Sequence, residues 1–179
     1  MTQEQKYTVV DKRDGYEIRR YRACVVADVK VNGDFDTAGN RAFSTLFKFI
    51  SGANNTGQKI SMTAPVIQQS SQSTRLQMWD EHTITFVLPA NMAMPDVPVP
   101  TDDHVRIRQV SEELVAALRF AGRMNETSFD SNKHRLQEYL TRDDFLQTDV
   151  ARIALFNAPW TPGFLRRNEI QIPVAPAAQ

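Results

Sequence analysis

The 179-residue chain has 41% hydrophobic and 23% charged residues, which is ordinary for a globular protein long enough to bury its own core. Its 21 basic residues balance 21 acidic ones, so no net field would concentrate nucleic acid or an anionic membrane at its surface. We therefore expect a single domain over residues 1–179, with neither nucleic acid nor a membrane as a partner.

The N-terminal segment and the cysteine content predict the compartment. Residues 1–7 lack the basic and apolar regions of a signal peptide, and no later run is as long as a membrane span. The lone cysteine, Cys24, lies in an apolar run and has no partner for an intramolecular disulfide, which suits a reducing compartment. These features predict a cytoplasmic protein.

Strands are predicted on both sides of a helix in the first half of the chain. Residues 16–31 alternate as two strands would, and residues 59–68 and 83–88 form a second predicted pair. The polar residues 68–74 are predicted to be the loop between that second pair.

The segment between these two pairs has the period of an amphipathic helix. Asp34 or Asp36 can cap its start, and Gly52 suits the left-handed position after its end. The apolar residues at helical spacing are Ala38, Ala42, Phe43, Leu46, Phe47 and Ile50.

Residues 89–103 contain four prolines, which cannot lie inside a central strand, so this segment divides the chain. The elements predicted after it are a strand with Val105 and Ile107, a strand at 113–122, a helix within 127–146, and strands at 151–157 and 167–173. The same order at similar spacing predicts a ββαββ unit over about residues 6–90 and again over 104–173.

Two such units predict the class α+β. Their eight strands would bury one face best by forming a distorted antiparallel eight-stranded β-barrel flanked by two α-helices, with the halves related by a pseudo-two-fold axis. A small apolar ligand would lodge in a cleft between helix and barrel.

Four motifs occur along the chain: YEIRRY at 16–21, FISGAN at 49–54, KISMTAPV at 59–66 and FLRRNEI at 164–170. In this order, over about residues 6–173, they resemble the SOUL/heme-binding protein family. The resemblance implies a barrel similar also to bacterial effector-binding domains, and non-covalent binding of heme or another tetrapyrrole near the first helix. The last motif also has a structural interpretation, because its alternating side chains can pair across strands.

The resemblance implies that basic side chains near the first helix face the porphyrin propionates. Lys48 occupies the matching basic position, and Arg41 lies about two turns earlier on the same face. Met62 is expected to line the cleft, although a strand methionine also suits a core, and the loop before residue 167 either closes over the ligand or plugs the barrel end. The predicted ligand-binding residues are Arg41, Ser44, Thr45, Lys48, Met62, Pro162 and Phe164. The alternative for Arg41 and Lys48 is that they merely solvate the helix.

One position departs from the family pattern. Some members carry a histidine, proposed as the axial iron ligand, where this chain has Arg20. A guanidinium cannot donate a lone pair to iron, so that mode of ligation is lost. Heme binding would then be weaker or depend on packing and propionate contacts.

Neither a catalytic residue nor a metal site is predicted. His82, His104 and His134 lack metal-ligand spacing and are interpreted as polar surface or edge residues, and no nucleophile elbow or phosphate-binding glycine loop occurs. The leading hypothesis is reversible tetrapyrrole binding for buffering, transport or sensing. The alternatives are an effector-binding module for other amphipathic small molecules and a small-molecule hydrolase using the same cleft. The sequence does not indicate an oligomeric state.

Overall fold

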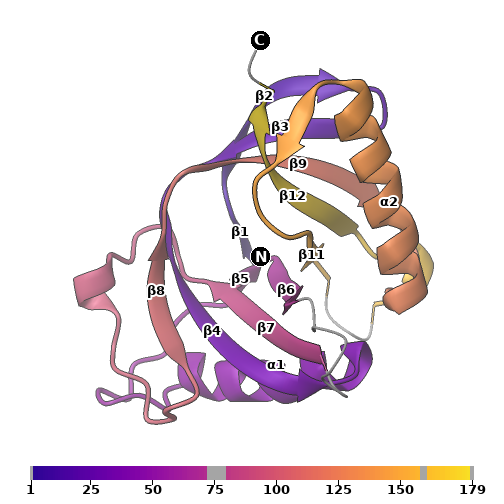
Figure 1. Ribbon diagram of the computed structural model, residues 1–179. Coiled ribbons are helices and arrows are strands. Elements are labelled where there is room, and N and C mark those ends of the chain that lie inside the picture. Colours follow the sequence, from indigo (N-terminus) through magenta and orange to yellow (C-terminus); the bar gives the residue numbers. More distant parts are fainter. Residues whose placement is uncertain (1, 72–79, 158–160, 178–179) are drawn as a thin grey trace. The chain divides into compact units, whose positions relative to one another are not determined.

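The computed structural model describes residues 2–71, 80–157 and 161–177. The chain forms two compact units, each with one helix packed on an antiparallel sheet (Figure 1). Unit 1 comprises Met1–Gln5 and Ala23–Ser111, and unit 2 comprises Lys6–Arg22 and Glu112–Gln179. The class α+β is therefore confirmed.

Unit 1 has a four-stranded antiparallel sheet whose spatial order differs from the chain order. The strands in spatial order are β8 (Arg106–Val110), β4 (Cys24–Gly33), β7 (Asp80–Val87) and β6 (Val66–Ser71). Two short strands, β1 (Gln3–Glu4) and β5 (Thr63–Ala64), pair in parallel. Helix α1 (Phe35–Ile50) packs on β4 and β7, and the core of the unit lies between them.

The ends of α1 are set by the residues that the sequence marks. Asp34 is the N-cap, and its carboxylate accepts hydrogen bonds from the Thr37 backbone N–H at 2.9 Å and the Thr37 hydroxyl at 2.7 Å. Gly52 follows the last turn with φ of +117°, where a Cβ would also lie 3.2 Å from the Gly57 carbonyl oxygen. A side chain at residue 52 would therefore strain the backbone and crowd it.

Asp34→Ala should lower the free energy of unfolding by about 1 kcal/mol, because two donors at the start of α1 would lose their acceptor. Urea denaturation followed by circular dichroism measures the loss. Asn40→Ala, at an exposed position inside the same helix, is the control and should leave stability nearly unchanged. Equal losses in both variants would contradict the capping role.

Unit 2 has a five-stranded antiparallel sheet. The strands in spatial order are β2 (Tyr7–Arg13), β3 (Tyr16–Tyr21), β9 (Glu113–Phe120), β12 (Asn168–Pro176) and β11 (Arg152–Leu155). The short strand β10 (Phe145–Gln147) also pairs with β12. Helix α2 (Glu126–Arg142) packs on β9, β10 and β12.

The two faces of this sheet differ in chemistry. Tyr16 stacks on Tyr139 of α2, with ring centroids 5.8 Å apart, so alternation along β3 turns Ile18 toward α2 and turns Glu17 and Arg19 to the opposite face. By the register of β9 and β12, Glu169 and Gln171 lie on that opposite face too. Unit 2 therefore has an apolar face under α2 and a charged face opposite.

The expected closed eight-stranded barrel is not what the described residues form. Further strands occur, β1, β2, β5 and β10 among them, and in neither unit does the strand order return to its first strand. β2 was missed because Val9 and Val10 are both exposed around a register shift between Val9 and Asp11, which removes the alternation that marks a half-buried strand. Such a bulged, exposed strand suits the edge of a sheet.

The predicted loop at 68–74 is wrong for residues 68–71, which belong to β6, while residues 72–74 lie outside the described residues. Gln68 can stay in a strand although it is buried, because its amide donates to the Phe35 carbonyl oxygen at 2.9 Å. A polar run therefore does not exclude a strand when each buried polar group finds a partner.

The two units share a strand order, but they do not coincide with the two sequence halves. The orders β8-β4-β7-β6 and β3-β9-β12-β11 match, each with its helix packed on the second and third strands. However, β3 comes from the first half of the chain and lies in unit 2, whereas β8 comes from the second half and lies in unit 1. Superposition of the halves within one domain stays a prediction.

Candidate ligand-binding site

Three of the predicted ligand-binding residues share the exposed face of α1. Arg41, Ser44 and Lys48 are exposed there, and Thr45 is half-buried. The side chains of Arg41 and Lys48 form neither an ion pair nor a hydrogen bond with another described residue. Two unpaired cations thus lie seven positions apart along this face.

An exposed aromatic ring lies on the same helix as these cations. Phe47 is 49% exposed and stacks on Phe43, with ring centroids 5.9 Å apart and planes 11° apart. Phe43 meets Phe86 of β7 edge to face, which anchors the pair to the core. Sequence reasoning assigned Phe47 to the apolar stripe. Its position at the edge of that stripe was the sequence feature that could have predicted its exposure.

The other three predicted residues are divided between the units. Met62 is half-buried in unit 1 and packs against the core cluster that also includes Leu46 of α1. Pro162 and Phe164 belong to unit 2, where both are exposed in and before a single 3-10 turn at Gly163–Leu165. Trp160, which precedes them, lies outside the described residues.

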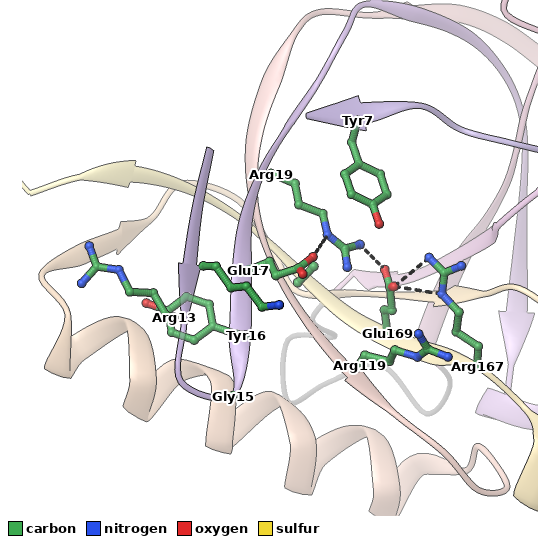
Figure 2. A pocket seen from close by; sticks show the side chains of 11 residues that line it. Tyr7, Arg13, Gly15, Tyr16, Glu17, Arg19, Arg119, Arg167 and Glu169 are labelled. Carbon is green, nitrogen blue, oxygen red and sulfur yellow. Dashed lines mark hydrogen bonds and ion pairs between the residues drawn. The ribbon is translucent and has the colours of Figure 1, made fainter. Parts of the chain in front are cut away.

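A cleft of about 350 Å³ opens in unit 2, lined by side chains of β2, β3, β9 and the start of β12 (Figure 2). Two of its lining residues, Glu17 and Glu169, are acidic. Its basic lining residues are Lys12, Arg13, Arg19, Arg119 and Arg167. We call this feature the arginine cleft.

A buried carboxylate organises the arginine cleft. Glu169 is fully buried and accepts hydrogen bonds from Arg19 at 2.7 Å and from Arg167 at 3.1 Å. Arg19 also donates to Glu17 at 2.9 Å, and its guanidinium carbon lies 4.2 Å from the centroid of the Tyr7 ring. Arg19 is therefore held on three sides, which fixes its guanidinium plane.

The network keeps its groups in defined protonation states. Burial alone would lower the pKa of Arg19, but the Glu169 carboxylate raises it above the ordinary value, so the guanidinium stays charged. Burial raises the pKa of Tyr21 to about 12, against the opposing hydrogen bond from Arg19. The Tyr21 hydroxyl is therefore neutral at physiological pH, and it also accepts from Gln171 at 3.2 Å.

Arg20, which stands where some family members have a histidine, is exposed at the end of β3. Adjacent residues on a strand face opposite ways, so Arg20 points away from the face that carries Arg19. Its half-exposed guanidinium pairs with Glu112 at 3.2 Å. Arg20 thus lies at the surface as one member of an exposed ion pair.

The expectation that His82 lies at the surface or an edge is wrong. His82 is 2% exposed on β7, between β4 and β6, with Nδ1 2.8 Å from the Ser70 hydroxyl and its ring against Phe35. His104 and His134 are exposed, as expected.

Among the described residues, no three His, Cys, Asp or Glu side chains gather as a metal site. Over the same residues, neither helix combines the length and apolar character needed to cross a membrane.

Over the residues that the structure describes, two helices, antiparallel sheets and a cleft of ligand size define an α+β protein with room for a small molecule. The family model described as SOUL heme-binding protein matches residues 2–173, and the chain belongs to that family.

Individual relatives agree with this assignment. Heme-binding protein 1 of Xenopus laevis is 27% identical over 170 residues, which cover 93% of this chain and 88% of that protein. Among solved structures, the EcmrR C-terminal domain aligns over 96% of this chain and 99% of that one with a TM-score of 0.69 at 11% identity. A hydrolase from Listeria innocua aligns over 88% and 91% with a TM-score of 0.58 at 10% identity. At such identities the structural likeness shows the fold alone.

Proposed function

We propose that this protein binds heme or a related tetrapyrrole reversibly and without a covalent bond, for buffering, transport or sensing, on the exposed face of α1. The observation that carries the proposal is the exposed Phe47 ring, backed by Phe43, on the same helix as the unpaired cations Arg41 and Lys48. Family membership and the name of the Xenopus laevis relative support the choice of ligand.

These side chains fit the parts of such a ligand. Phe47 offers an aromatic surface on which a flat macrocycle can stack, and burying the macrocycle supplies most of the affinity. Arg41 and Lys48 would pair with the two propionates, while Ser44 and Thr45 would line the helix between them. When bound, heme supplies an iron centre and a strong visible absorption band.

The more distant predicted residues keep supporting roles in the proposal. Met62 would line the edge of the site from the core side of α1. Pro162 and Phe164 are exposed on unit 2, and their contact with a ligand stays a prediction from the sequence. Such binding changes no bond in the ligand.

Catalysis in the arginine cleft has less support than binding. A hydrolase acting there would need a carboxylate free to accept a proton. Both carboxylates that line the cleft are occupied, since Glu17 pairs with Arg19, and Glu169 pairs with Arg19 and Arg167.

Arg41→Ala and Lys48→Ala should each weaken hemin binding roughly fivefold, because each removes a charged hydrogen bond whose strength is reduced by exposure to solvent. Heme dimethyl ester, which has no free propionates, should bind both variants as it binds the unmodified protein. Phe47→Ala should weaken the binding of both ligands, because stacking on the ring does not depend on the propionates. Titration followed by Soret absorbance measures these affinities.

Arg106→Ala is the matched control, since Arg106 is exposed in the same unit and its side chain has no ion pair or hydrogen bond with another described residue. It should leave hemin affinity unchanged, with circular dichroism confirming the fold of every variant. Unchanged affinity in the Arg41→Ala/Lys48→Ala double variant would move the ligand away from α1 and leave the two cations as solvated charges.

A further inference from the structure

We propose that the arginine cleft is a second, separate site, which binds small molecules carrying two or more negative charges on carboxylate or phosphate oxygens. Its lining has five basic and two acidic side chains, a formal surplus of three positive charges, although one of the five, Arg13, is paired with Asp11 outside the lining. A volume of about 350 Å³ lies at the lower end of the range for small-molecule sites. The cleft therefore favours a compact polyanion.

The internal ion pairs leave part of this charge uncompensated. Glu169 engages Arg19 and Arg167, and Glu17 engages Arg19. Arg119 and Lys12 line the same cleft, and neither side chain has an ion pair or a hydrogen bond to another described residue. These two side chains are thus available donors for a bound anion.

The position of Arg119 gives the site its centre. Arg119 on β9 lies directly opposite Glu169 on β12 in the strand register. Figure 2 shows the guanidinium groups of Arg19 and Arg167 joined to the carboxylate of Glu169, and Arg119 lines the same cleft. Glu169 and Glu17 carry two negative charges against these three guanidinium groups, so a bound oxyanion would reduce the repulsion among the three.

The site is already organised without a ligand. Glu169 is fully buried and Arg19 nearly so, so their geometry is fixed by packing, and Arg167 is further held over the Phe156 ring at 3.7 Å. Guanidinium groups held in place can bind carboxylate or phosphate in a bidentate manner with little loss of side-chain entropy. A lipophilic cation, by contrast, would meet repulsion in this cleft.

The test is isothermal titration calorimetry with citrate and with pyrophosphate at constant ionic strength. We expect the protein to bind at least one of them, and Arg119→Ala to weaken that binding roughly fivefold. Charge reversal in Arg119→Glu should abolish it. Stronger binding of citrate than of pyrophosphate would identify carboxylates as the preferred chemistry, and the reverse order would identify phosphates.

Arg20→Ala is the control, because Arg20 follows Arg19 in the sequence but points to the other face of β3. It should bind both anions normally. Absence of binding to either anion at millimolar concentration, or an equal loss in Arg20→Ala, would overturn the proposal. Hemin affinity should be unchanged in Arg119→Ala, and its loss there would show that the cleft is part of the tetrapyrrole site rather than separate from it.

Discussion

Glu169→Ala should lower the free energy of unfolding by about 3–5 kcal/mol, a large fraction of the stability of a typical protein. The Glu169 side chain is fully buried and joins Arg19 to Arg167. Its removal would leave the buried guanidinium of Arg19 without its strongest partner, in surroundings from which water is largely excluded. The cost is that of a buried charge left with only the partly exposed Glu17 as its carboxylate partner, which exceeds the value of the lost hydrogen bonds alone.

Glu112→Ala is the matched control for this prediction. Glu112 also pairs with an arginine of β3, Arg20, but its side chain is 53% exposed. Its loss should cost less than about 1 kcal/mol, because water replaces the partner. Urea denaturation of both variants, monitored by circular dichroism, gives the comparison. Similar losses from the two substitutions would mean that the buried network does not contribute to stability in the way described.

Leu46→Ala should cost about 2–5 kcal/mol, because Leu46 is fully buried between α1 and the sheet of unit 1 and its truncation leaves a cavity. The adjacent Phe47→Ala should cost much less, since about half of that side chain already contacts water. Denaturant titration of the pair measures both values.

The effects of the same two substitutions on hemin affinity should be the reverse of their effects on stability. Phe47→Ala should lose affinity while it stays folded, and Leu46→Ala should keep its affinity at temperatures where it is still folded. A Phe47→Ala variant that is as unstable as Leu46→Ala would show that the Phe47 ring contributes to the core rather than to a ligand surface.

Local patterns predicted the elements well where each residue's surroundings follow from its own segment. The cap at Asp34, the period of α1 and the glycine after it are all within one stretch of chain. The register shift in β2 and the burial of His82 depend on which strands become neighbours, which no single segment states. The positions of the predicted strands along the chain were thus more accurate than their lengths or the burial of their side chains.

The two candidate sites differ in the same respect, because one lies within a single segment and the other depends on which strands become neighbours. Helical spacing alone put Arg41, Ser44 and Lys48 on one face of α1, and the structure places all three on its exposed side. The arginine cleft was not predicted, because Arg19 and Glu169 are 150 positions apart in the sequence. Alternation within a strand shows on which face of that strand Arg19 or Glu169 lies. It does not show that both side chains lie on the same face of the folded sheet.

The exchange of strands between the sequence halves constrains how the protein folds during synthesis. The β2–β3 hairpin can form early, but the strand that β3 pairs with outside the hairpin, β9, begins only at Glu113. An isolated two-stranded hairpin is at best marginally stable in water. The N-terminal hairpin must therefore wait for most of the chain, and closing so long a loop adds an entropic cost that slows folding. Chains released early would expose this hairpin, which makes truncated products candidates for aggregation.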